Sequence, residues 1–149
     1  MTEASLGRIS ANYALLAERM PALAQAFYDR LFTVLPESRP MFKIDIALQS
    51  QHMAAALGLI VRNMRLLDAL QQPLMDFGVQ HARVGVRPEH YPIVCRAMVD
   101  TLAQGSGENW SPQLDADWSE ALATVSRIMM QGALAEATAT ANRALQPVP

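Results

Sequence analysis

Apolar residues recur every three or four positions along almost the whole chain, and this periodicity constrains the fold more than any other feature. Leu6, Ile9, Tyr13 and Leu16 form one such series, which gives a helix a single apolar face. A longer series over residues 46–66 predicts the longest buried helix. No stretch shows the two-residue alternation of a β-strand bounded by turn residues. The pattern therefore predicts an all-α fold of six to eight helices joined by short loops.

Prolines indicate where several of these helices begin. Pro21, Pro73 and Pro88 each precede a helical series, and proline suits the first helical turn because its missing N–H would have no partner there. For the last helix, Ser111 is a suitable N-cap and Pro112 a suitable first residue.

The length of the chain fits a single domain. A chain of 149 residues can bury one sizeable core and still leave room for a cavity. After Gln131 the sequence turns to small and polar residues and ends in prolines. We therefore expect a folded domain over residues 1–135 and a frayed tail over residues 136–149.

Charge, apolar runs and cysteine content exclude several partners and environments. The net charge is −2 with acidic and basic residues interspersed, so we expect no binding to nucleic acid or to an anionic membrane. The longest apolar run, Met53–Val61, is too short to span a bilayer. Cys95 is the only cysteine and no signal peptide opens the chain, so we expect a cytoplasmic protein.

Most motifs of enzymatic chemistry are missing from the sequence. It has neither a Gly-x-Ser-x-Gly elbow nor a phosphate-binding glycine loop. Its three histidines, His52, His81 and His90, do not form a zinc cluster, and His90 is expected at the surface. Haem remains open, because it needs little more than one imidazole and an apolar slot between helices.

Three separated segments carry a recognisable pattern. They read FYDRLFTVLPESRPMF (27–42), QSQHMAAALGLIVRNM (49–64) and LMDFGVQHARVGVRPEHYPIV (74–94). In this order and spacing they resemble the bacterial single-domain globins, which are similar to the haem domain of flavohaemoglobins. The resemblance covers about residues 6–132, and it implies a globin fold around haem b, iron protoporphyrin IX.

The resemblance implies roles for four residues on the distal side of the haem. Tyr28 matches the tyrosine that points at the bound ligand, and Phe42 the phenylalanine that packs on the haem face. Gln49 matches the distal glutamine, and Met53 the apolar position beside the ligand. Gln49 and Met53 are four residues apart, so they share one face of a helix.

On the proximal side, the resemblance makes His81 the iron ligand and Tyr91 the tyrosine that supports it. The spacing from Gln49 to His81 fits the family without a gap, whereas a distal His52 would require an insertion. The glutamate that the family adds to this support falls on Ala133. Glu136, nearly one turn later, is the nearest substitute.

The resemblance implies a protein that binds O2, NO or CO at a five-coordinate ferrous iron, for oxygen binding, storage or transport with NO detoxification. The alternatives are a nitric-oxide dioxygenase that depends on a separate reductase, and a haem-based gas sensor. Because the printed chain ends at Pro149, we expect the electrons to come from an external reductase. Two questions stay open: whether the protein is a monomer or a homodimer, and whether Met53, His52 or Tyr28 ligates the iron when no gas is bound.

Overall fold

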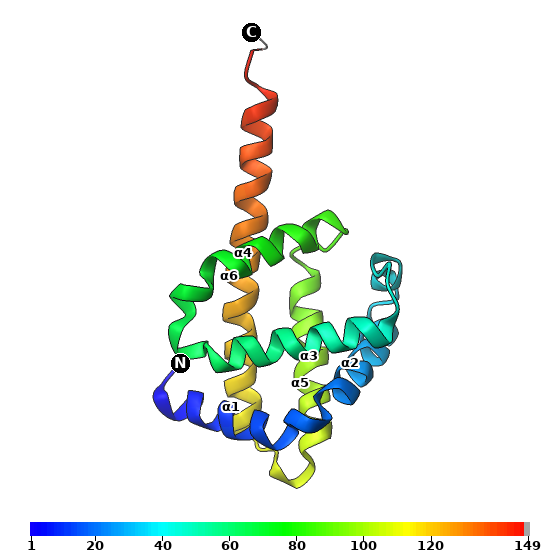
Figure 1. The fold of residues 1–149 in the computed structure, drawn as a ribbon, viewed down its shortest axis with the longest axis vertical. Helices are drawn as coiled ribbons and strands as arrows, with labels where there is room; N and C mark the ends of the chain where they lie inside the picture. The colour runs from blue at the N-terminus through cyan, green and yellow to red at the C-terminus, as the bar shows by residue number, and fades with distance from the viewer. Residues whose placement is uncertain (148–149) are drawn as a thin grey trace.

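The computed structural model describes residues 1–147, and all regular structure within them is helical, which confirms the predicted all-α fold. Six α-helices follow one another in this part of the chain (Figure 1), namely α1 (Glu3–Leu16), α2 (Met20–Val34), α3 (Ile46–Arg62), α4 (Leu67–Arg83), α5 (His90–Ser106) and α6 (Pro112–Ala144). Short 3-10 turns lie between them, namely η1 (Ala17–Arg19), η2 (Pro36–Met41), η3 (Met64–Leu66) and η4 (Gly107–Asn109). No helix of these residues is long and apolar enough to cross a membrane.

Two of the predicted helix starts are confirmed. Ser111 caps α6, because its Oγ accepts a hydrogen bond from the backbone N–H of Leu114 at 3.1 Å, and Pro112 is the first helical residue. A cap of this kind contributes about 1 kcal/mol. Pro21 lies in the first turn of α2, where its missing N–H costs nothing.

The prediction that a helix begins at Pro73 is wrong. α4 begins at Leu67, and Pro73 lies inside it. Leu70, which precedes the proline, packs with Leu74 in a small apolar cluster. This burial holds the turns before the proline in helical form despite the hydrogen bond that the proline removes.

The main core lies where α1, α2, α3, α5 and α6 meet, and a buried polar chain ties three of these helices together. Trp118 of α6 is fully buried, and its Nε1 donates to Asn12 Oδ1 of α1 at 3.0 Å. Asn12 Nδ2 in turn donates to Ser106 Oγ of α5 at 2.9 Å. The buried side-chain N and O atoms of these three residues all have hydrogen-bond partners. The three linked side chains therefore fix the arrangement of the helices without an unsatisfied buried group.

α4 is positioned mainly by α6. Figure 1 shows α4 crossing α6 near its middle, and the contact between them is the most extensive of any helix pair in the described structure. Leu70 and Leu74 of α4 pack against Val125 of α6 in the second, smaller apolar cluster. The position of α4, which carries His81, therefore depends on α6.

α6 continues through the predicted domain boundary at residues 135 and 136 without interruption and ends at Ala144. Alanine and other good helix formers make up much of this stretch. Glu136 also forms ion pairs through its Oε1, which lies 3.5 Å from Nη2 of Arg143 and 3.9 Å from Nη2 of Arg83. Residues 148 and 149 of the predicted tail lie outside the described residues, and the domain boundary itself stays a prediction.

Candidate functional site

Tyr28 and Gln49, two of the predicted site residues, meet between α2 and α3. Gln49 Nε2 donates to Tyr28 Oη at 3.2 Å. Tyr28 is 1% exposed, and burial raises the pKa of its phenol, although the hydrogen bond from Gln49 acts in the opposite direction. The phenol therefore keeps its proton at neutral pH. Because Tyr28 accepts from Gln49, that proton remains available for another acceptor.

An aromatic cluster holds the Tyr28 ring in place. Its centroid lies 5.1 Å from that of Phe42 in an edge-to-face contact and 5.0 Å from that of Phe27. Phe32 joins the cluster from the next turn of α2, and Arg39 of η2 lies over its ring at 5.0 Å. Phe42 follows η2 directly, so the same contacts fix the corner between α2 and α3.

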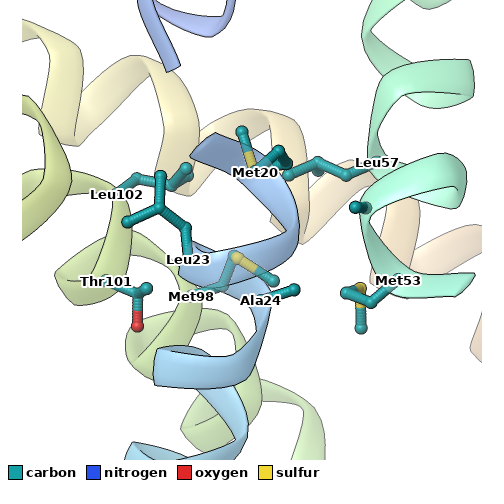
Figure 2. A pocket seen from close by; sticks show the side chains of 9 residues that line it. Met20, Leu23, Ala24, Met53, Leu57, Met98, Thr101 and Leu102 are labelled. Carbon is teal, nitrogen blue, oxygen red and sulfur yellow. The ribbon is translucent and has the colours of Figure 1, made fainter. Parts of the chain in front are cut away.

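Met53 lies one turn after Gln49 on α3 and borders an apolar gap between α2, α3 and α5. Figure 2 shows the side chains that line it, which are Met20, Leu23, Ala24, Met53, Ala54, Leu57, Met98, Thr101 and Leu102. These side chains pack so closely that the space between them does not admit a water molecule. The interior beside Met53 is therefore dry.

His81 lies in the last turn of α4, and its two ring nitrogens have different roles. Nδ1 donates to the backbone carbonyl oxygen of Phe77 at 2.7 Å. This bond selects the tautomer with the proton on Nδ1, so Nε2 presents a lone pair, the form that binds a metal. The end of α4 and the start of α3, which carries Gln49, both lie away from η3, the turn that joins these two helices (Figure 1).

The structure does not bring Tyr91 into a hydrogen bond with His81, because Nδ1 of the histidine is already bonded to Phe77. Tyr91 is buried on α5, and burial, followed by the nearby Cys95, raises the pKa of its phenol. Its support of His81 stays a prediction. Glu136, the nearest substitute for the missing carboxylate, pairs with Arg83 and Arg143 and not with the histidine.

The other two histidines differ in burial. His52 is exposed on α3. His90, expected at the surface, is buried instead: its Nδ1 accepts from the backbone N–H of Arg87 at 3.0 Å, and its Nε2 lies 3.5 Å from Glu37 of η2. The expectation failed because a helix-start position says nothing about the corner from η2 that covers it. His90 thus joins the loop after α4 to the corner before Phe42.

A comparison with protein families decides the class of this fold. The model of the family described as Globin matches residues 25–129. The chain belongs to the globin family. Both the predicted family and the predicted globin fold are therefore confirmed, and membership implies a haem cofactor.

Relatives of this globin include bacterial and plant proteins of known name. It is 27% identical over 132 residues to a flavohemoprotein of Rhizobium meliloti (strain 1021), which covers 87% of this chain and 33% of the relative. It is also 27% identical over 106 residues to an anaerobic nitrite reductase of Oryza sativa subsp. indica, which covers 67% of this chain and 73% of that one. This globin spans about a third of the flavohemoprotein that it matches.

Solved structures agree on the fold. An engineered carbene transferase, a putative nitric oxide dioxygenase from Rhodothermus marinus, superposes with a TM-score of 0.86 at 24% identity, over 95% of this chain and 99% of that one. A bacterial globin from Campylobacter jejuni gives 0.81 at 21% identity, over 92% and 99%. At these identities the likeness establishes the fold alone.

The residues present fit a haem. No group of three or more His, Cys, Asp or Glu within residues 1–147 could hold a metal ion by itself. An iron bound by His81 would therefore need its remaining ligands from a macrocycle, which is what haem provides. The free Nε2 of His81 suits such a group.

Proposed function

We propose that this globin binds haem b through Nε2 of His81 and holds a diatomic gas, O2, NO or CO, beside Tyr28 and Gln49. The single observation that carries the proposal is the hydrogen bond from Gln49 to Tyr28, because it leaves the phenol proton free for the gas. Oxygen binding or storage is the function that we favour.

Haem would supply an iron that takes up a diatomic gas reversibly. Tyr28 would then donate a hydrogen bond to the bound gas, while the amide of Gln49 holds the phenol in position. The burial of Tyr28 would strengthen that hydrogen bond, because little water can compete for its hydroxyl. We therefore expect O2 to leave slowly.

The partner of His81 supports reversible binding over rapid turnover. The Phe77 carbonyl is a neutral acceptor, so it gives the imidazole less negative character than a carboxylate would. Ala133 stands where the family places that carboxylate, and Glu136 is engaged by arginines.

A second candidate is conversion of NO and O2 to nitrate, with a reductase supplying the electrons for repeated turnover. The free phenol proton of Tyr28 favours it, and so does the resemblance to flavohaemoglobins. We place either activity in the cytoplasm, where Cys95 would stay a free thiol. Nitrate yield after NO is added to the O2-loaded protein, with and without a reductase, decides between the two.

The test of the main proposal is His81→Ala beside His52→Ala, a matched loss of one imidazole at an exposed position. We expect His81→Ala to lose most of its haem and its Soret band, and His52→Ala to retain both. Equal haem content and identical spectra in His81→Ala and the parent would show that His81 is not the ligand.

A further inference from the structure

Two glycines lie where α4 crosses α6, and each faces the backbone of the other helix. A Cβ added at Gly78 of α4 would overlap the carbonyl oxygen of Met129 and lie 2.5 Å from its carbonyl carbon. A Cβ added at Gly132 of α6 would overlap the carbonyl oxygen of Met75 and lie 2.6 Å from its carbonyl carbon. The two helices therefore touch backbone to backbone at two points one turn apart.

This contact differs from those of other glycines in the chain. A Cβ at Gly58 of α3 would meet the hydroxyl of Tyr13 at 2.5 Å, and that hydroxyl is the end of a side chain that can turn away. A Cβ at Gly7 would meet nothing within 4 Å. At Gly78 and Gly132 the obstacle is main chain in the middle of a helix, so a methyl group can be accommodated only if α4 and α6 move apart.

Gly78 is also tied directly to His81. It follows Phe77, whose carbonyl accepts from His81 Nδ1, and it lies within one turn of the histidine. Leu74, one turn earlier, is 2% exposed, so α4 cannot rotate about its axis without exposing an apolar side chain. A displacement of α4 from α6 at Gly78 must therefore displace the imidazole as well.

We infer that Gly78 and Gly132 are positioning residues for His81, because they set how close its Nε2 can stand to the haem iron by fixing α4 directly on α6. The inference rests on the proposed function, in which His81 holds the haem. Neither glycine touches the haem, and both act through the position of α4.

The experiment compares Gly78→Ala and Gly132→Ala with two controls, Gly7→Ala and Gly58→Ala, in the haem-loaded protein. The readouts are the iron–histidine stretching band in the ferrous form and the rate of haem transfer to excess apomyoglobin. We expect a shifted band and haem loss about 10- to 100-fold faster in the first two variants. The controls should keep the parent's values, and an unchanged band in Gly78→Ala would overturn the inference.

Detaching the ligand separates position from general stability. In His81→Gly supplied with free imidazole, the ligand is no longer carried by α4, so adding Gly78→Ala should leave the iron–imidazole band where it was. A shift of the same size in this background would show that the glycine acts on the pocket as a whole, which overturns the inference. Val99→Ala, a loss of core volume on α5, serves as a destabilised control whose band should not move.

Other outcomes are equally decisive. If neither glycine variant folds, hydrogen exchange in the haem-loaded parent takes their place: the amides of residues 74–81 must exchange as slowly as those of the α5 core, and faster exchange overturns the inference. A parent chain that binds no haem would overturn the proposed function together with this inference. A parent that binds haem while Gly78→Ala keeps its band would overturn the inference alone.

Discussion

The distal and proximal sides of the proposed haem site are built in different ways. On the distal side, other side chains hold the residues in place. Tyr28 accepts a hydrogen bond from Gln49 and packs in an aromatic cluster, and Met53 packs among apolar side chains. On the proximal side, His81 is held by the main chain, through the Phe77 carbonyl and the direct contact of α4 with α6 at Gly78.

The difference shows which side of the site can change its shape. A methionine side chain can change rotamer at low cost, so the part of the site that Met53 borders can adjust its shape. A contact between two helix backbones has no such freedom, because a shift moves whole elements. We therefore expect substitutions of similar size to cost much more on the proximal side.

The largest effect should come from the same substitution placed against main chain and against a side chain. Gly78→Ala should lower the free energy of unfolding by about 3 kcal/mol, because the methyl group meets the main chain of Met129. Gly58→Ala should stay within about 1 kcal/mol of the parent, since Tyr13 can move and alanine favours the helix. Urea denaturation of both variants measures the difference, and equal costs would refute the contrast.

Removal of the distal donor should have the next largest effect, on the gas and not on the fold. Tyr28→Phe deletes a hydrogen bond to a polarised ligand, worth about 2 kcal/mol, so O2 should leave roughly 30-fold faster. Stopped-flow displacement of O2 by CO gives the rate. Tyr13→Phe, which removes a phenol hydroxyl that faces Gly58, is the control and should leave the rate near that of the parent.

A smaller effect is expected where side chains alone define the site. Met53→Leu nearly conserves volume in the apolar gap, so the free energy of unfolding should change by less than about 1.5 kcal/mol. The rate of CO entry should change measurably even though the stability changes little, because Met53 borders the apolar gap. A thermal melt measures the stability and flash photolysis measures the rate of CO entry. A stability loss as large as that of Gly78→Ala would show that the side chains around Met53 cannot adjust.

The smallest effect concerns alkaline pH. Burial raises the pKa of Tyr28 above its ordinary value of 10.0, so the unfolded chain releases the phenol proton first. Stability is therefore retained below pH 10 and falls as pH rises toward the folded-state pKa. Tyr28→Phe should lose less stability over that interval than the parent, although Tyr91, whose pKa is also raised, still contributes. Denaturant midpoints at successive pH values from 9 upward provide the measurement, and parallel curves would count against it.

Local patterns were sufficient to predict much of this molecule. The three- and four-residue period gave the helices, and Ser111 with Pro112 marked the start of α6, because capping depends on residues close together in sequence. The pairing of Tyr28 with Gln49 agrees with the distal roles expected from the motifs, and those roles stay proposals.

Features that depend on distant contacts could not be predicted in this way. Pro73 lies inside α4 because Leu70 is buried against other helices, and His90 is buried because η2 covers it. Glu136 pairs with arginines on α4 and α6 and leaves the histidine without a carboxylate. The role of the two glycines could not be predicted either. Nothing in the sequence indicates that Gly78 faces α6 or that Gly132 faces α4.

The direct contact between α4 and α6 also has a consequence for synthesis on the ribosome. Gly132 is added 51 residues after His81. At typical rates of translation, roughly 3 to 10 s pass between the synthesis of His81 and that of Gly132. During this time α4 lacks the helix that positions it. Trp118, which joins α6 to Asn12 near the other end of the chain, is added within the same interval. If His81 holds the haem as proposed, the nascent chain therefore carries the ligand early and can bind the cofactor tightly only after α6 has been made.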